Sequence, residues 1–169
     1  LFDLRYDSAQ NRIVCPVFSP DNNLVGAVGR RLDNREPRYY NYFNFESGKA
    51  LGGITLISDN PKLIICEGFF DAVNCYSWAD NLGADVVCTW KAELSKYQAN
   101  KILKLDKTVS VWYDGDLAGE TGWKKAQKIL GKYTYGLRRA VLPEGKDLGD
   151  LSSPEFRAIY TSIYGESYE

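Results

Sequence analysis

The apolar residues of this chain change their spacing along it, and from residue 62 onward two kinds of spacing alternate. Short apolar runs of the strand type span residues 62–67, 85–89, 108–113 and 135–142. Apolar positions at helical spacing lie between them, over residues 69–80, 91–105 and 117–131. Regular alternation of strands and helices builds βαβ units, in which the strands run parallel. The pattern therefore predicts an α/β fold with a mainly parallel sheet flanked by helices.

The first third of the chain has a different pattern. Residues 12–18 and 24–31 have the pattern of two strands joined by a Ser-Pro-Asp-Asn-Asn turn, so a β-hairpin is expected. Pro16 lacks a backbone N–H and is expected at an edge or a bulge. Aromatic residues then interleave with polar and basic ones over residues 37–45. Such a stretch suits either a groove for single-stranded nucleic acid or the core of a small subdomain, and the sequence leaves both open.

Turn-forming residues divide the chain into three parts. A pair of glycines and an Asp-Asn-Pro turn place a boundary near residue 59. We expect a small α+β basic subdomain over residues 1–59, an α/β domain over residues 60–150, and the start of a truncated helical segment over residues 151–169. Ser153-Pro154 is a typical beginning for that last helix. Because the chain opens on Leu1 rather than Met, we expect it to be part of a longer protein.

Composition excludes several kinds of chemistry. The 169 residues contain no histidine, so histidine general bases and histidine-ligated zinc are excluded. The four cysteines show no C-x-x-C spacing and lie mostly in apolar runs, which predicts buried free thiols in a reducing compartment. No apolar run approaches the roughly 20 residues of a membrane span, and no signal-peptide pattern precedes residue 12. Oxygen ligands, lysine and arginine remain as the residues for catalysis.

The net charge of −1 conceals an uneven distribution. Four arginines lie within residues 30–38, and six basic residues with no acid lie within residues 124–139. A basic surface around an acidic pocket favours a polyanionic substrate. Three further lysines, at positions 101, 104 and 107, are expected only to solvate a helix face.

Acidic residues follow three of the predicted strands. Glu67 ends the first strand, with Asp71 four residues on, and Asp114 and Asp116 flank a glycine after the third. Asp147 follows the fourth. Because the carboxyl ends of parallel strands meet at one edge of a sheet, these carboxylates are expected to cluster there. Such a cluster repels itself unless cations bind it, which predicts a site for Mg²⁺ or Mn²⁺, with two or more ions.

The acidic segments resemble those of a known family. Residues 67–71 fit the pattern E-G-x-x-D, residues 114–119 fit D-G-D-x-A-G, and residues 142–147 fit L-P-x-G-x-D. These motifs resemble the toprim domain and, more narrowly, the RNA polymerase core of bacterial and phage DnaG-type primases. Upstream, residues 16–18, 26–31, 37–41 and 49–53 are similar to the basic N-terminal subdomain of those primases.

The resemblance implies an enzyme, a DNA-directed RNA polymerase. It would make short RNA primers on a single-stranded DNA template from ribonucleoside triphosphates, by metal-dependent nucleotidyl transfer. The implied catalytic residues are Glu67, Asp114 and Asp116, and the implied metal ligands are Glu67, Asp71, Asp114, Asp116 and Asp147. The implied phosphate-binding residues are Arg30, Arg31, Arg38 and Lys49. Primases usually continue as D-P-D after the last acid, whereas here Asp150 is displaced by one residue, so no role is assigned to it.

The same resemblance implies partners and a location. A replicative helicase would bind through segments outside this chain or fused to it, no membrane would be involved, and the protein would work in the cytoplasm of a bacterium or of an infected host cell. Two alternatives share the acidic motifs: a toprim-type nuclease, and a non-catalytic toprim protein that binds DNA in recombination. The basic N-terminal subdomain favours the primase, and the nearly complete set of acids argues against a non-catalytic protein.

Overall fold

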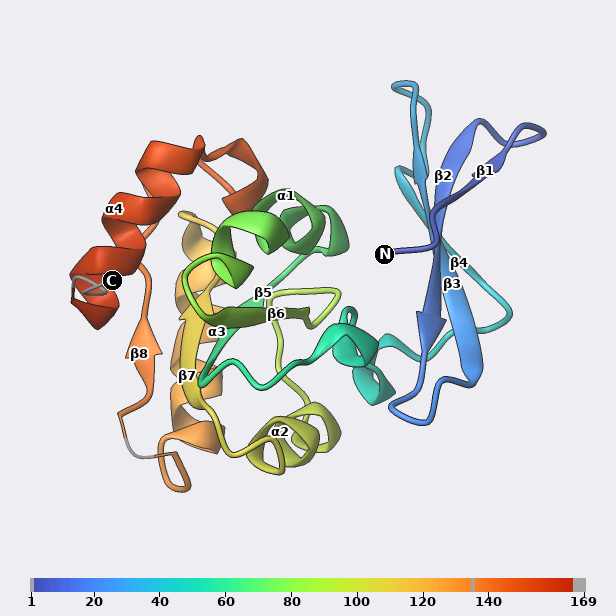
Figure 1. The fold of residues 1–169 in the computed structure, drawn as a ribbon. Coiled ribbons are helices and arrows are strands. Elements are labelled where there is room, and N and C mark those ends of the chain that lie inside the picture. The colour runs from blue at the N-terminus through green and yellow to red at the C-terminus, as the bar shows by residue number, and fades with distance from the viewer. Residues whose placement is uncertain (1, 135, 166–169) are drawn as a thin grey trace.

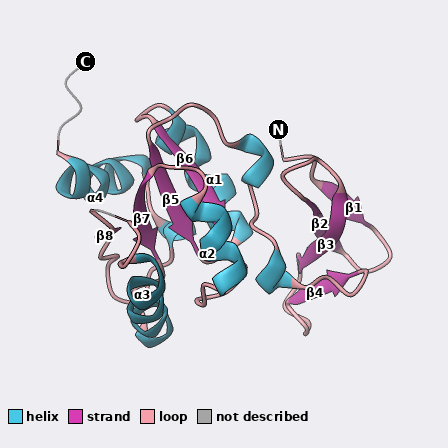
Figure 2. Cartoon of the chain, turned by 90° about the horizontal axis from the view of Figure 1, so that it is seen from below, coloured by secondary structure: helices cyan, strands magenta, loops and turns pink. Residues whose placement is uncertain are grey.

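The chain forms two units that lie side by side (Figure 1). The structure is a computed structural model, and it describes residues 2–134 and 136–165. The N-terminal unit is a four-stranded antiparallel sheet, and the second unit is a four-stranded parallel sheet covered by helices. Figure 2 shows the two sheets separated by the helices and loops that join them. The predicted α/β fold with a mainly parallel sheet is confirmed.

The N-terminal sheet is a simple meander. Its strands follow one another in the order β1 (Arg5–Asp7), β2 (Arg12–Phe18), β3 (Leu24–Arg31) and β4 (Tyr39–Tyr42). The predicted hairpin is confirmed as β2 and β3. Pro16 lies beyond the part of β2 that pairs with β1 and is opposite Ala27 of β3, close to a register shift between Val17 and Phe18, as expected of a proline at an edge or a bulge. Helical structure in this unit consists of two 3₁₀ turns, η1 (Ser47–Lys49) and η2 (Ile54–Leu56).

The second unit is built around adjacent parallel strands. Its sheet has the order β6-β5-β7-β8, formed by β5 (Lys62–Cys66), β6 (Ala84–Cys88), β7 (Thr108–Trp112) and β8 (Arg138–Arg139). Its helices are α1 (Phe69–Asp80), α2 (Lys96–Leu103), α3 (Leu117–Leu130) and α4 (Ser153–Tyr164). The chain leaves β5 for β6 on one side and returns to β7 on the other. The carboxyl ends of β5 and β7 therefore form a topological switch point, where ligands usually bind in such sheets.

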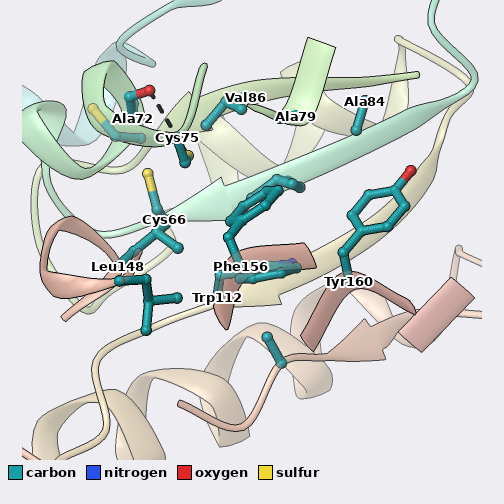
Figure 3. Close-up of a cluster of buried hydrophobic side chains, with 14 of the residues drawn as sticks. Cys66, Ala72, Cys75, Ala79, Ala84, Val86, Trp112, Leu148, Phe156 and Tyr160 are labelled. Carbon is teal, nitrogen blue, oxygen red and sulfur yellow. Dashed lines mark hydrogen bonds between the residues drawn. The ribbon is translucent and has the colours of Figure 1, made fainter. Parts of the chain in front are cut away.

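The alternation of side chains along β5 explains why both faces of the sheet are covered. Ile64 and Cys66 face the cluster formed with α1 and α4, and Leu63 and Ile65 face the cluster formed with α2 and α3. Figure 3 shows the first cluster, in which the rings of Trp112 and Phe156 stack with centroids 4.9 Å apart. All four cysteines are free and buried, as predicted. None of the described helices is both long and apolar enough to cross a membrane.

Two predicted elements are shorter in the structure. The helix expected over residues 91–105 begins only at Lys96, because Ser95 caps it through a capping box: its Oγ accepts from the Gln98 N–H at 3.0 Å. The strand expected over residues 135–142 is reduced to β8. Residue 135, the first of the expected strand, lies outside the described part of the chain. The last helix begins at Ser153 as predicted and ends at Tyr164, and residues 166–169 of the predicted C-terminal segment also lie outside that part.

Contacts near the predicted boundary at residue 59 join the two units. The backbone of Gly52 exchanges two hydrogen bonds with Cys88, each of 3.0 Å, and Leu51 and Ile54 belong to the cluster that α2 and α3 cover. The residues just before the boundary are therefore packed into the second unit.

The expectation that Lys107 merely solvates a helix face is wrong, because its Nζ lies 2.9 Å from Asp85 Oδ2 in a buried ion pair.

Candidate active site

Glu67 and Asp114 meet at the switch point because of the strands that precede them. β5 and β7 are neighbours with Cys66 opposite Trp112, so the residues that follow both strands emerge at the same edge. Glu67 is the first residue after β5, and Asp114 is the second after β7. The backbone N–H of Asp114 donates to Glu67 Oε1 at 3.2 Å. These two acids therefore lie next to each other at the edge of the sheet, as predicted.

Asp71 and Asp147 form a second pair of neighbouring carboxylates. Asp71 lies in the first turn of α1, where its Oδ2 accepts from the Gly68 N–H at 2.8 Å. Asp147 caps the 3₁₀ turn η3 (Leu148–Asp150). A Cβ on Gly149 would lie 3.0 Å from Asp147 Oδ1 and 3.1 Å from Asp71 Oδ1. The glycine leaves free a space that both carboxylate oxygens face.

The glycine of the D-G-D motif brings the two acidic loops together. A Cβ on Gly115 would lie within 2.1 Å of the Pro143 carbonyl oxygen, so no other residue fits without a backbone shift. Gly115 N–H donates to the Lys146 carbonyl at 2.9 Å, and Gly145 N–H donates to the Gly115 carbonyl at 3.0 Å. These bonds connect the end of β7 to the loop before η3, and they bring Asp147 to the edge where Asp114 lies.

A pocket of about 310 Å³ lies over this edge. Four predicted acids line it: Glu67, Asp71, Asp114 and Asp147. The N-terminal sheet contributes Arg30, Arg38 and Tyr39 to the same pocket. The Arg30 guanidinium lies over the Phe70 ring, 4.9 Å from its centroid, which holds this part of the N-terminal sheet against the beginning of α1. The pocket therefore combines carboxylates from one unit with arginines from the other.

The remaining predicted site residues lie outside this pocket. Asp116 is the N-cap of α3, and its Oδ1 accepts from the Gly119 N–H at 2.8 Å. Arg31 pairs with Asp33 at 2.7 Å, and Lys49 pairs with Glu46 at 2.6 Å. The roles of Asp116, Arg31 and Lys49 in metal or phosphate binding stay predictions. Asp150, to which the sequence assigned no role, donates its N–H to Asp147 Oδ1 at 2.8 Å and so supports that acid.

Several residues that line the pocket were not predicted from the sequence as site residues. Trp90 and Lys91 follow the carboxyl end of β6, at the same edge as Glu67 and Asp114. The rule that identified the acids could have identified them too, because it applies to every parallel strand. The aromatic stretch at residues 37–45 is divided: Phe45 is buried against Trp90, as expected of a subdomain core, whereas Tyr39 and Tyr40 are exposed. A role of the exposed rings in binding nucleic acid stays a prediction.

Burial and mutual repulsion raise the proton affinity of these acids. The pKa of Glu67 is raised to about 7, first by burial and then by the charges of Asp116, Asp71 and Asp147, although the Asp114 N–H opposes that rise. The pKa of Asp114 is raised to about 7, again by burial first and then by Glu67 and Asp71. Burial, followed by the charge of Asp147, also raises the pKa of Asp71, although the Gly68 N–H opposes that rise. Without a counter-charge, the site favours a bound proton over the free carboxylate.

The oxygen atoms of the site fit a divalent cation that shares its coordination with a ligand. Asp114 Oδ1 is buried and accepts no hydrogen bond, which leaves a lone-pair donor free for a cation. Within residues 2–134 and 136–165, no three acidic or cysteine residues are grouped closely enough to hold a metal ion by themselves. Magnesium typically takes one or two carboxylates and completes its shell with water and substrate phosphates. An open set of carboxylates next to arginines is consistent with that mode.

The raised pKa values predict how metal-free stability depends on pH. The folded protein holds protons on Glu67 and Asp114 up to about pH 7, whereas the ordinary values are 4.5 and 3.8, so the unfolded chain loses them first. Their contribution to stability is therefore present at low pH and is lost as pH rises. Shifts of this size in two groups correspond to a loss of about 5 kcal/mol between pH 5 and pH 8. Because both carboxyl groups are partly exposed and solvent screens their charges, we expect a smaller loss, on the order of 2 kcal/mol, or about 4–8 °C in Tm.

Thermal unfolding in a chelator, followed by circular dichroism at several pH values, measures this slope. Magnesium or manganese should restore Tm at pH 8 more than at pH 5, because a cation replaces the lost protons. The matched variant carries Glu67→Gln and Asp114→Asn together, and its Tm should vary less with pH and respond less to the metal. An unchanged slope and metal response in that variant would remove these two acids from the explanation.

Known proteins resemble this chain over both of its units. Among solved structures, the Aquifex aeolicus primase, comprising zinc-binding and RNA polymerase domains, matches with a TM-score of 0.75 and 29% identity, covering 90% of this chain and 40% of that one. A DnaG catalytic core matches with a TM-score of 0.76 and 25% identity, covering 90% and 53%. The aligned region therefore includes the N-terminal sheet as well as the parallel sheet.

Curated proteins give the same picture. A DNA primase of Clostridium acetobutylicum is 30% identical over 148 residues, which cover 84% of this chain and 24% of the relative. The DNA primase of Aquifex aeolicus is 30% identical over an alignment of 170 positions, gaps included, which covers 94% of this chain and 33% of the relative. This chain thus spans about a quarter to a third of the length of these relatives. The family described as Toprim-like matches residues 64–152, and because these make up more than half of its length, the chain belongs to that family.

Proposed function

We propose that this chain is the catalytic core of a DNA primase, which joins ribonucleotides on a single-stranded DNA template and releases pyrophosphate. The observation that carries the proposal is the shared pocket, in which Glu67 and Asp114 of the parallel sheet lie with Arg30 and Arg38 of the N-terminal sheet. The relatives named DNA primase match across both of these units. A nuclease function would account only for the acids. A primase function would also account for the arginines of the N-terminal unit, because they can bind the phosphates of its substrates.

The acids supply the cation-binding half of the site. Glu67, Asp71, Asp114 and Asp147 would hold Mg²⁺ or Mn²⁺, and a bound ion would neutralise triphosphate charge and stabilise the attacking and leaving oxygens. Glu67 Oε1 is held by the Asp114 N–H, so we assign Glu67 Oε2 to the cation or to the attacking 3′-hydroxyl. In the second case the carboxylate could accept that hydroxyl's proton.

The arginines supply the anion-binding half. Arg30 is fixed over Phe70 and lines the pocket beside Asp71, so it would bind triphosphate oxygens next to the cation. Arg38 and Tyr39 are exposed at the mouth of the same pocket, where they would contact the nucleotide or the template backbone. Exposed aromatic rings beside cations suit single-stranded DNA, because bases stack on the rings while the cations neutralise phosphates.

The wider setting rests on the resemblance. We infer that a replicative helicase acts with this core through parts of a longer protein, and that the protein works in the cytoplasm of a bacterium or of a phage-infected cell. The relatives are about three to four times as long as the matched region, which leaves room for such parts.

One experiment separates the candidate functions. The chain is incubated with single-stranded DNA, labelled ribonucleoside triphosphates and magnesium or manganese, and the products are resolved on a denaturing gel. New labelled oligonucleotides that depend on template sequence support the primase. Shortened template instead supports the nuclease, and binding without either product supports a non-catalytic protein.

A further inference from the structure

A buried arginine, Arg12 in β2, lies beneath the arginines of the pocket. Its side chain is only 1% exposed. Its Nη2 donates to the Pro37 carbonyl at 2.7 Å, and its Nη1 donates to the carbonyls of Arg38 at 3.1 Å and Gly29 at 3.3 Å. Burying a guanidinium costs free energy unless its donors are satisfied, and here backbone carbonyls satisfy most of them.

The three carbonyls belong to the two segments that carry the pocket's arginines. Gly29 immediately precedes Arg30 in β3, and Pro37 and Arg38 form the segment that enters β4. Arg30 and Arg38 line the acidic pocket, whereas Arg12 does not. One buried side chain therefore joins the backbones of both segments at the point where each presents an arginine to the site.

The chemistry of the guanidinium suits this arrangement. Its planar group offers five donors in a fixed fork, which can hold two neighbouring carbonyls and a third at once, while a lysine ammonium cannot reach all three. The group also lies over the Tyr40 ring, 5.7 Å from its centroid, which restricts its orientation further. No carboxylate of the described residues forms an ion pair with Arg12 within 4.0 Å, so its charge is held by carbonyl dipoles and an aromatic ring.

We propose that Arg12 is a positioning residue, which sets the spacing of Arg30 and Arg38 so that both bind the phosphates of one incoming nucleotide. The proposal rests on the proposed function and adds how the N-terminal sheet builds the phosphate site. Preorganised cations bind a polyphosphate more tightly because less conformational freedom is lost on binding.

The variant Arg12→Lys tests this. It keeps the charge but loses the fork, so we expect the KM for ribonucleotides to rise about tenfold while kcat changes by less than about threefold. The dissociation constant for inorganic tripolyphosphate, measured by calorimetry with magnesium present, should rise by a similar factor. Arg12→Gln should show a larger rise, and Gln10→Ala, which removes the acceptor of the Arg12 Nε bond of 3.3 Å at an exposed position, a smaller one.

The matched control is Tyr42→Phe in the same sheet. It removes the 2.7 Å hydrogen bond from the Tyr42 hydroxyl to Asp7 and so destabilises the N-terminal sheet without releasing residues 37 and 38. This control should lower Tm and leave the tripolyphosphate affinity unchanged. If it weakens binding as much as Arg12→Lys does, or if folded Arg12→Lys and Gln10→Ala bind as the wild type does, the positioning role is overturned.

The outcomes also separate this inference from the proposed function. Should the wild type make no primers while Arg12→Lys still binds tripolyphosphate about tenfold more weakly than Tyr42→Phe does, the primase proposal fails and the positioning role stands. Should the wild type make primers with KM unchanged in Arg12→Lys, the primase proposal stands and the positioning role fails. Gln10→Ala decides the question if both Arg12 variants fail to fold, because its side chain is exposed.

Discussion

Primer synthesis by Glu67→Gln is expected to fall by a factor of about 100 to 1,000, the usual cost of losing a charge contact made in the transition state. Glu67 lies at the switch point, hydrogen-bonded by Asp114 and lining the pocket beside three other acids. Glutamine keeps the size and can still accept from the Asp114 N–H. It cannot carry the negative charge that would bind a cation or accept a proton.

The same variant should be folded, and more stable than the wild type without metal at pH 8. Its neutral amide removes a buried charge whose pKa is raised to about 7 by burial and by neighbouring acids. Loss of activity with gain of metal-free stability is the signature of a functional charge rather than of a structural one. Steady-state primer synthesis over a manganese titration and thermal unfolding in chelator measure the two effects.

Asp150→Asn is the matched control for Glu67→Gln. Asp150 lies near the same acids but does not line the pocket. It is the last residue of η3, where its Oδ2 accepts from the Asp147 N–H at 3.3 Å, and the side-chain oxygen of asparagine can still accept that bond. Its activity should stay within about threefold of the wild type. A folded Glu67→Gln protein that made primers as fast as Asp150→Asn would remove the central residue of the proposed mechanism.

Charge reversal of the two pocket arginines, Arg30→Glu together with Arg38→Glu, is expected to weaken nucleotide binding by roughly a hundredfold. The new carboxylates would face Glu67, Asp71, Asp114 and Asp147 across a pocket of about 310 Å³, and would repel both the triphosphate and the template. Template binding should also depend less on salt, because fewer counterions are released when two cations are lost. Calorimetry with a ribonucleoside triphosphate and fluorescence anisotropy with labelled single-stranded DNA over a salt series measure these effects.

Arg35→Glu is the control for that reversal. Arg35 lies in the loop between β3 and β4, which also carries Arg38. It is exposed, pairs with Asp33 at 2.7 Å and does not line the acidic pocket. Its variant should bind the triphosphate with near wild-type affinity. If Arg35→Glu weakens triphosphate binding as much as the double reversal does, the effect comes from net charge and not from the pocket.

The separate variants Arg31→Glu and Lys49→Glu test the remaining phosphate-binding predictions. Both residues form ion pairs outside the pocket. Template affinity that falls in either variant, with unchanged triphosphate affinity, would place them on the path of the DNA. Unchanged affinity for both ligands would leave them with a structural role only.

The alternation of strands and helices was enough to predict the acidic edge. Parallel strands must all end at the same side of a sheet, so Glu67 after β5 and Asp114 after β7 had to emerge together once the βαβ pattern was recognised. The two helices on either side of the switch point, α1 and α3, also begin and end close to where their apolar spacing predicted. This part of the fold is local, because each element follows from the spacing of its own residues.

Element boundaries set by capping were less predictable. Apolar spacing extends the second helix back to residue 91, but the reciprocal bonds of Ser95 and Gln98 begin it at Lys96. Lys91, the first residue of the predicted helix, lines the pocket instead, together with Trp90 just before it. Similarly, the last strand is limited to two residues, because among the described residues of the range 136–142 only Arg138 and Arg139 are in ladder register with β7.

What the sequence alone determined is the parallel sheet and the acids at its edge, because side-chain periodicity and strand direction are properties of the chain itself. What only the tertiary structure decided is which charges meet. Arg30 and Arg31 are adjacent, yet a strand sends their side chains to opposite faces, and one lines the acidic pocket while the other pairs with Asp33. Asp114 and Asp116 also separate, although by a turn and not by strand alternation: Asp114 lines the pocket, whereas Asp116 caps α3 and acts on Glu67 through its charge. These choices depend on how the N-terminal sheet and the loops pack against the parallel sheet, and the spacing of residues along one strand carries no record of that packing.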